Sequence, residues 1–125
     1  MPAAAAPASA AAATAAVNAS VMEVFVREGC RHCSDEEAFF EQWSTEGGPV
    51  AAYHDISNPA DRALFERLVE LARLPKATPL TFVNGTVVQG FDDAATTGKG
   101  LRDLIASQAG KPAITPEQAI AAGKV

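Results

Sequence analysis

The sequence is poor in basic charge, in long apolar runs and in cysteine. Its 125 residues carry 10 Lys and Arg against 15 Asp and Glu, which gives a net charge of −5. Because nucleic acids and anionic membranes attract clustered Lys and Arg, this balance argues against both as partners. No run approaches the about 18 apolar residues of a membrane-spanning helix. Two cysteines are too few for the disulfide framework of a small secreted scaffold. From the length of 125 residues we expect one domain with a modest hydrophobic core.

The first 20 residues lack charge and contain twelve alanines. Such a segment has too little bulky apolar side chain to build a core, so we expect a flexible tail or linker. It also lacks the basic and leucine-rich parts of a secretory signal. Its Ala-x-Ala pattern is nevertheless typical of the start of an exported chain. We therefore expect a periplasmic or exported protein, with a cytoplasmic location as the alternative.

The two cysteines lie close together, in the stretch Cys30-Arg31-His32-Cys33. A β-branched run over 21–26 predicts a buried central strand before them, and an acidic and aromatic segment after them has the pattern of a helix. If Cys30 caps this helix, its sulfur faces unpaired N–H groups and the positive end of the helix dipole, which favour the thiolate. A free thiol titrates near about 8.5, and we expect the pKa of Cys30 to lie lower. Cys33, one turn further on, is close enough to form a disulfide with Cys30.

Charged residues near the cysteines also affect the pKa that we expect for Cys30. Positive charge near the first sulfur comes from Arg27, Arg31 and His32. The acids at 35–37 oppose it at longer range and suit the first turn of a helix. We expect Cys30 to be the attacking thiolate and Cys33 the resolving thiol.

Metal binding by the same cysteines is the main alternative. A structural zinc site wants about four ligands, and the chain has no second Cys-x-x-Cys to supply them. A two-sulfur copper(I) site is the stronger rival, and it would resemble the heavy-metal-associated copper chaperone domains, whose paired cysteines also follow a first strand. We therefore keep a copper(I) carrier as an open alternative.

The middle of the chain predicts a strand and a helix. The run 50–56 has strand composition, and Asn58 and Pro59 suit the cap and first position of a helix that we expect to end near Arg73. Leu64, Leu68 and Leu71 recur at helical spacing on its inner face. We expect His54, near the end of the strand, to be solvated or hydrogen-bonded rather than catalytic.

The rest of the chain predicts a hairpin and a last helix. Asn84-Gly85 between two β runs is a strong hairpin signal, and Pro79 precedes the first run. We expect a helix that ends near Gly110, with Gly98 and Gly100 interrupting its beginning. Residues 111–125 are interpreted as a C-terminal tail with a short helix after Thr115.

In this order of elements, the sequence resembles the thioredoxin superfamily and, within it, the glutaredoxins. Four matches over about residues 22–108 carry the resemblance: Arg27, the Cys30 to Cys33 pair, Thr78-Pro79, and Gly90-Phe91-Asp92-Asp93. The resemblance implies an α/β fold over residues 21–110, with a four-stranded mixed sheet flanked by about three helices. It also implies that Pro79 is cis and faces the cysteines.

The resemblance implies a glutathione site as well. Arg27 would bind a carboxylate of glutathione, Thr78 would pair with its main chain, and Asp92 and Asp93 would lie near its ammonium group. For these two acids, an ordinary turn and helix cap is an equal alternative. The pair Arg31-His32 departs from the proline and aromatic residue usual between the cysteines. These two residues are further candidates for substrate contact, and the histidine suggests a less reducing couple than that of thioredoxin.

We therefore expect a glutaredoxin-like thiol–disulfide oxidoreductase that exchanges protein or glutathione mixed disulfides. The chemistry needs no metal or organic cofactor, and glutathione is the expected co-substrate. The expected partners are disulfide-bearing client proteins or a redox partner protein, with the chain as a monomer. Besides the copper(I) carrier, two alternatives stay open: an iron–sulfur site shared by two chains, and an interaction module that has lost catalysis.

Overall fold

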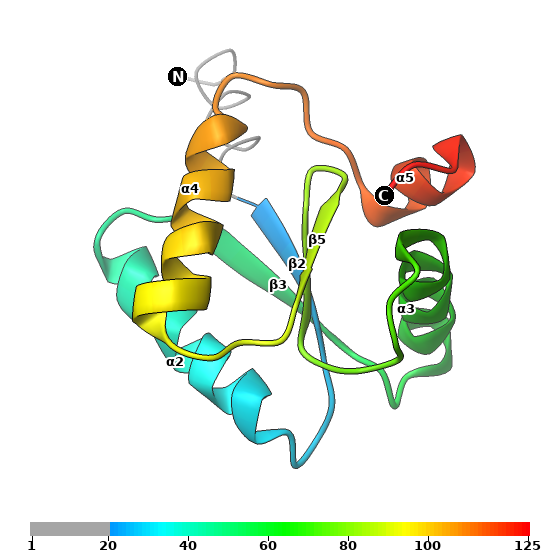
Figure 1. The fold of residues 1–125 in the computed structure, drawn as a ribbon, viewed down its shortest axis with the longest axis horizontal. Coiled ribbons are helices and arrows are strands. Elements are labelled where there is room, and N and C mark those ends of the chain that lie inside the picture. Colours follow the sequence, from blue (N-terminus) through cyan, green and yellow to red (C-terminus); the bar gives the residue numbers. More distant parts are fainter. Residues whose placement is uncertain (1–20) are drawn as a thin grey trace, which may run out of the picture.

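Residues 21–125, the part of the chain that the computed structural model describes, form a four-stranded sheet with helices on both faces (Figure 1). The strand order is β3-β2-β4-β5. The strands are β2 (Val21–Val26), β3 (Val50–Asp55), β4 (Leu80–Val83) and β5 (Thr86–Gln89). β2 runs parallel to β3 and antiparallel to β4, which pairs with β5 in an antiparallel hairpin. The predicted four-stranded mixed sheet is confirmed, whereas the predicted tail over 1–20 lies outside the described residues.

β2 is one of the two central strands, and the composition of its sequence predicted a central position. Met22, Val24 and Phe25 are each 0% exposed. Because successive side chains of a strand point to opposite faces, Met22 and Val24 join the core on one face of the sheet and Phe25 joins the core on the other. The strand thus contributes to both cores, and its last residue, Val26, stands four positions before Cys30.

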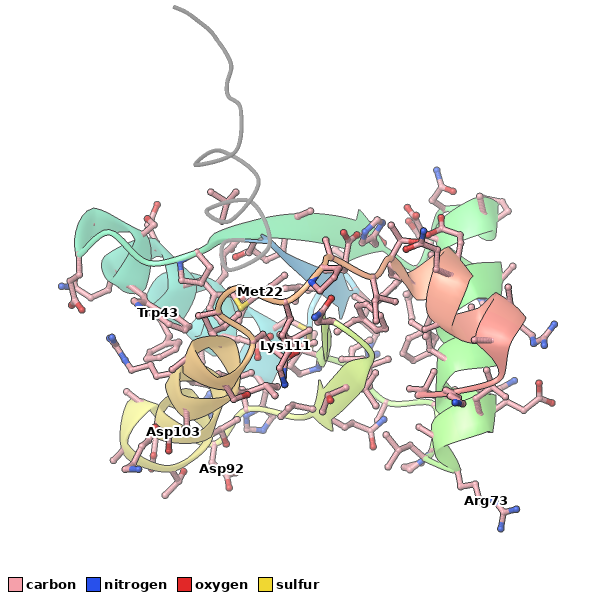
Figure 2. All side chains as sticks on the ribbon, turned by 90° about the horizontal axis from the view of Figure 1, so that it is seen from above. Met22, Trp43, Arg73, Asp92, Asp103 and Lys111 are labelled. Carbon is pink, nitrogen blue, oxygen red and sulfur yellow. A yellow bond between two sulfur atoms is a disulfide. The ribbon has the colours of Figure 1, made fainter. Side chains whose placement is uncertain are left out.

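The first face of the sheet is covered by α2 (Arg31–Thr45) and α4 (Lys99–Ser107). α2 ends at Thr45, because the following Gly47-Gly48-Pro49 cannot continue a helix. Figure 2 shows Met22 and Trp43 between this helix layer and the sheet. The same core contains Val24, Phe39, Phe40, Val83, Phe91, Leu101 and Ile105.

The opposite face is covered by α3 (Pro59–Ala72) and α5 (Pro116–Ala122). α3 begins where the sequence predicted, because the side chain of Asn58 accepts hydrogen bonds from the backbone N–H groups of Ala60 and Asp61. The core here contains Phe25, Phe65, Leu68, Val69, Leu80, Phe82 and Ala119.

The interpretation of residues 111–125 as a tail needs correction. The short helix after Thr115 is present, and Thr115 and Gln118 form a capping box at its start. However, α5 packs on α3, and Ala119 is only 3% exposed. The small side chain of Ala119 lets the two helices approach. The folded domain therefore extends past Gly110. Residues 21–125 contain four α-helices rather than about three.

The last predicted helix begins differently from expectation. A π-helical turn, η1 (Ala94–Gly98), leads directly into α4, and Gly100 lies inside α4 without breaking it. A Cβ at position 98 would lie 2.7 Å from the ring of Phe39, so glycine permits the close approach of η1 to α2. Within residues 21–125, no helix combines the length and the apolar character that crossing a bilayer requires.

Candidate active site

Cys30 is the N-cap residue of α2, as predicted, and its sulfur lies at the start of the helix. Gly29, with a φ of 76°, turns the chain from β2 into this position. The Sγ of Cys30 accepts a hydrogen bond of 3.2 Å from the backbone N–H of Cys33. The two cysteines form a disulfide, their Cα atoms are 5.2 Å apart, and their exposed fractions are 8% and 6%. After reduction, the same N–H group would stabilise a thiolate on Cys30.

Thr78, in the segment before β4, contacts the sulfur of Cys30. Its hydroxyl donates to the Sγ of Cys30 over 3.4 Å, and its carbonyl oxygen lies 3.7 Å from the same sulfur. The Thr78–Pro79 peptide bond is cis. Cys30 therefore has two donors aimed at its sulfur, one from its own helix and one from the segment before β4.

Arg27 is joined to this arrangement through Thr78. The Nε of Arg27 donates to the Oγ1 of Thr78 over 3.2 Å. The guanidinium polarises the hydroxyl that in turn donates to Cys30, which strengthens that contact. The structure thus connects three of the predicted site residues, Arg27, Cys30 and Thr78.

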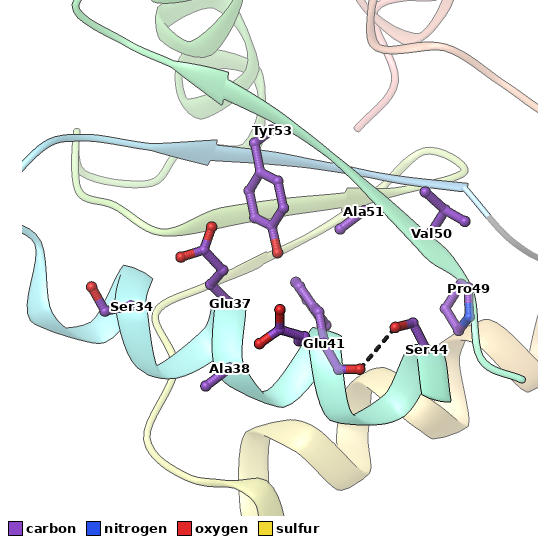
Figure 3. A pocket seen from close by; sticks show the side chains of 10 residues that line it. Ser34, Glu37, Ala38, Glu41, Ser44, Pro49, Val50, Ala51 and Tyr53 are labelled. Carbon is purple, nitrogen blue, oxygen red and sulfur yellow. Dashed lines mark hydrogen bonds between the residues drawn. The ribbon is translucent and has the colours of Figure 1, made fainter. Parts of the chain in front are cut away.

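A small hollow of about 170 Å³ lies beside the disulfide. Its lining includes Arg27, Cys30, Cys33, Glu37 and Tyr53. Through Glu37 and Tyr53 it adjoins a larger groove of about 590 Å³ between α2 and β3. Figure 3 shows the hydroxyl of Tyr53 pointing from β3 toward the carboxylates of α2. The pKa of Tyr53 is raised to about 12, mainly by burial and then by the negative charges of Glu37, Glu36 and Glu41. Its hydroxyl is therefore neutral and able to donate a hydrogen bond.

Arg31 and His32 occupy the first turn of α2 with exposed side chains. Neither belongs to the hollow beside the disulfide. The acids at 35–37 lie in the second turn of α2, not in the first as we expected, because the helix begins at Arg31. Arg31 and His32 therefore lie between the two cysteines in the chain, with their side chains at the surface.

Asp92 and Asp93 occupy the turn before η1. The backbone N–H of Gly90 donates to the carbonyl oxygen of Pro79 over 2.8 Å, which ties the turn to the cis-proline. Asp93 caps η1, and its hydrogen bonds with the hydroxyl and backbone N–H of Thr96 lower its pKa. Figure 2 shows Asp92 pointing away from the body of the protein. Over residues 21–125, no hydrogen bond or ion pair joins either acid to Arg27 or to the cysteines.

His54 is hydrogen-bonded, as expected, and lies away from the cysteines. Its Nε2 is 2.6 Å from Glu23 and its Nδ1 is 3.0 Å from Asp61, while its ring stacks on Phe25. Burial alone would lower the pKa of His54, but the hydrogen bonds and charges of Glu23 and Asp61 together raise it. This cluster links β2, β3 and α3 on the opposite face of the sheet from the disulfide.

Sequence reasoning overlooked two features of the site. The hydroxyl of Thr78 contacts the sulfur, whereas only its backbone was expected to act. Glu36 is 0% exposed on the same face of α2 as Cys33, although it was grouped with its exposed neighbours. Its spacing from Cys33 and Phe40, at i, i+3 and i+7, is the signal that could have placed it inside.

Comparisons with known proteins bear on the fold. No model of a protein family matches the chain, and no curated protein sequence matches it either. Among solved structures, the chain is similar to the crystal structure of a glutaredoxin from Archaeoglobus fulgidus, with a TM-score of 0.51 and 16% sequence identity. The similarity covers 67% of this chain and 84% of that one.

The order of the strands, the flanking helices and the cysteine pair at the start of α2 define the thioredoxin fold. The chain is therefore similar in fold to a glutaredoxin, as the sequence resemblance indicated.

Proposed function

We propose that the protein is a thiol–disulfide oxidoreductase in which Cys30 is the nucleophile and Cys33 the resolving thiol. The observation that carries this proposal is the environment of the Cys30 sulfur. It lies at the N-terminus of α2 and receives hydrogen-bond donors from Cys33 and Thr78. Donors in these positions favour the thiolate, which is the reactive form of cysteine.

In the reducing direction, the thiolate of Cys30 attacks one sulfur of a client disulfide. A bond forms between Cys30 and that sulfur while the client S–S bond breaks, and the client's second sulfur leaves as a thiolate. The thiolate of Cys33 then attacks Cys30, which forms the Cys30–Cys33 disulfide and releases the client's first sulfur. The client gains two electrons and the protein loses two. The same steps in reverse oxidise a client dithiol.

Glutathione is the co-substrate that we propose, with Arg27 as its anchor. The hydrogen bond to Thr78 uses the Nε of Arg27, so a carboxylate would be bound by its terminal nitrogens. The backbone of Thr78 lies beside the sulfur of Cys30, where the cysteine of glutathione must react. The turn containing Asp92 and Asp93 is tied to Pro79, and its acids would supply negative charge for the ammonium group.

The proposed location in an oxidising compartment rests on residues 1–20 alone.

Trapping of the mixed disulfide tests the proposal. The Cys33→Ser variant of the full chain, reduced and then treated with glutathione disulfide, should carry one glutathione on Cys30, seen as an added mass. The matched Cys30→Ser variant should react far more slowly, because the sulfur of Cys33 lies deeper in the helix and is not its cap. A chain that forms no adduct on Cys30, and instead binds one copper(I) per cysteine pair, would contradict the proposal and favour the metal carrier.

A further inference from the structure

β3 is an edge strand whose outer side has no partner strand among residues 21–125. Within this part of the chain it pairs only with β2, and the backbone N–H of Ile56, just after it, donates to Val26 in β2. Backbone groups alternate in direction along a strand, so those of Ala51 and Tyr53 face outward. Lysines or prolines often protect such an edge from pairing, but the sequence of β3 contains neither.

The side chains of β3 are also open to solvent. Val50 is 65% exposed and Tyr53 is 41% exposed, although both are large and largely apolar. The groove of about 590 Å³ lies between this strand and α2, and Ala51 contributes only a methyl group to that space. An exposed apolar strand edge beside a groove has the character of an interaction surface.

The groove ends at the cysteine pair. Ser34, Glu37 and Tyr53 line both the groove and the hollow beside the disulfide. Figure 3 shows Tyr53 above Glu37, with Val50 nearer to Ser44 at the far end. The groove therefore follows β3 from Val50 to Tyr53, and a segment bound along it would lead to the disulfide.

The charge of the groove decides which occupant fits. Glu37 and Glu41 are the only charged residues that line it, and over residues 21–125 neither forms an ion pair. A second copy of this chain would bring the same acids and a net charge of −5 to the edge, so electrostatic repulsion disfavours self-pairing. A basic segment of another protein has the complementary charge.

The two acids also match the spacing of an extended chain. As residues i and i+4 of α2, Glu37 and Glu41 lie about 6 Å apart along the helix axis. Alternate residues of a strand point to the same face and lie about 6.6–6.8 Å apart. A strand added to the edge of β3 would therefore place two side chains of one face over the groove, one near each acid.

We propose that the edge of β3 and the groove beside it bind an extended, basic segment of the client protein next to its reactive cysteine. This inference rests on the proposed function, because the client is the protein whose disulfide Cys30 attacks. The segment pairs with the backbone of Ala51 and Tyr53 as an added strand, and its Lys or Arg side chains contact Glu37 and Glu41. Antiparallel pairing, the slightly more stable arrangement, puts the client cysteine on the N-terminal side of the basic residues.

Two matched peptides test this surface on the full chain after reduction. Each begins with a cysteine in a mixed disulfide with a chromophoric aromatic thiol, followed by either two lysines or two glutamates at alternate positions. Attack by Cys30 on the peptide sulfur releases the coloured thiolate, so absorbance gives the rate. Complementary charge raises association rates by about 10–10³-fold, and we expect the lysine peptide to react on the order of tenfold faster at low salt. High salt should reduce this ratio.

The Glu41→Gln variant locates the effect in the groove. Glu41 lines the groove but not the hollow beside the cysteines. We expect Glu41→Gln to lower the ratio of the two peptide rates by about two- to fivefold, as for the loss of one exposed ion pair. The ratio cancels any change in the reactivity of Cys30. Asp35→Asn removes the same charge from an exposed position of α2 outside the groove and should keep the ratio.

Backbone methylation of the lysine peptide tests the added strand. Only alternate backbone N–H groups of such a strand face β3. Methylating one alternate set of nitrogens should therefore slow the reaction, and methylating the other set should not. Equal effects of the two sets would overturn the pairing with β3.

Other outcomes separate this inference from the proposed function. Equal rates for the two peptides at low salt, or an unchanged ratio in Glu41→Gln, would overturn the inference. A dimer that sedimentation detects and Tyr53→Glu dissociates would assign the edge to a second copy and also overturn it. If a small neutral disulfide still reacts with Cys30 in these cases, the proposed function stands. Failure to trap glutathione on Cys30 in Cys33→Ser would overturn the proposed function itself.

Discussion

The hydroxyl of Thr78 lies 3.4 Å from the Sγ of Cys30, although 48 residues separate the two in the chain. The contact places a hydrogen-bond donor against the sulfur that we propose as the nucleophile. The same hydroxyl accepts a hydrogen bond from Arg27. The positive charge of the guanidinium therefore acts on the sulfur through Thr78 and not by direct contact. The proposed reactivity of Cys30 therefore depends on the segment before β4 as well as on its own helix.

Removing the Thr78 hydroxyl should slow the attack by Cys30. A hydrogen bond to a charged group contributes about 1.5–3 kcal/mol, so Thr78→Val should reduce the rate of attack on glutathione disulfide by on the order of tenfold or more at mildly acidic pH. Thr78→Ser should restore most of the rate, because it keeps the hydroxyl. The matched control is Thr86→Val at an exposed position of β5. Equal rates for Thr78→Val and the wild-type chain would show that the contact has no effect on reactivity.

Removing the charge of Arg27 should weaken the use of glutathione. For a glutathionylated substrate, we expect Arg27→Gln to raise KM by on the order of tenfold, since a charge-assisted hydrogen bond is lost. For a small neutral disulfide without carboxylates, KM should stay the same. Arg62→Gln on α3, on the opposite face of the sheet, is the control. If both substrates lose affinity equally, Arg27 does not bind a carboxylate of glutathione.

The buried Glu36 should make stability depend on pH. Its pKa rises from 4.5 to about 7 on folding, so the folded state holds the proton more tightly. The free energy of unfolding should therefore fall as the pH rises from 4.5 to about 7, by about 3 kcal/mol at most. Urea unfolding of the wild-type chain and of Glu36→Gln over this pH range gives the difference directly. A difference between the two chains that does not change with pH would contradict the burial of an ionisable Glu36.

The docking of α5 should contribute to the stability of the domain. Ala119 is buried against the core of α3, so Ala119→Asp should place an unpaired charge there and lower the free energy of unfolding by about 3 kcal/mol. Ala121→Asp puts the same charge on the exposed side of α5 and should cost far less. Urea unfolding compares the two variants. Equal stability of both would mean that α5 is not part of the cooperative unit.

The elements of this fold could be predicted because each has a local signal. Asn58 with Pro59 marks the start of α3, Asn84-Gly85 marks the hairpin, and Cys30 occupies the predicted cap of α2. The packing of α5 had no such signal. Its contact with α3 includes the small buried residue Ala119 and the partly buried Ile120, in a segment that resembles a tail in composition.

The candidate site could be predicted from the sequence only where its residues lie close together along the chain. Cys30 and Cys33 are three residues apart, and their roles follow from the helix that they begin. The contacts of Thr78 with Cys30 and of Thr81 with Glu36 join β4, or the segment before it, to α2 across 48 and 45 positions. Such contacts depend on the register of the sheet. The one local clue to Glu36 was its helical spacing from Cys33, which the neighbouring exposed acids obscured.

The redox equilibrium of the Cys30–Cys33 pair in glutathione buffers tests the central claim most directly. The full chain is equilibrated at a series of ratios of reduced to oxidised glutathione, quenched with acid, and its free thiols are alkylated and counted by mass. We predict one two-electron transition between a dithiol and a disulfide at a defined ratio, with a glutathione adduct on Cys30 as the intermediate. A pair that does not change its oxidation state across the series, or that exchanges without forming an adduct on Cys30, would contradict the account.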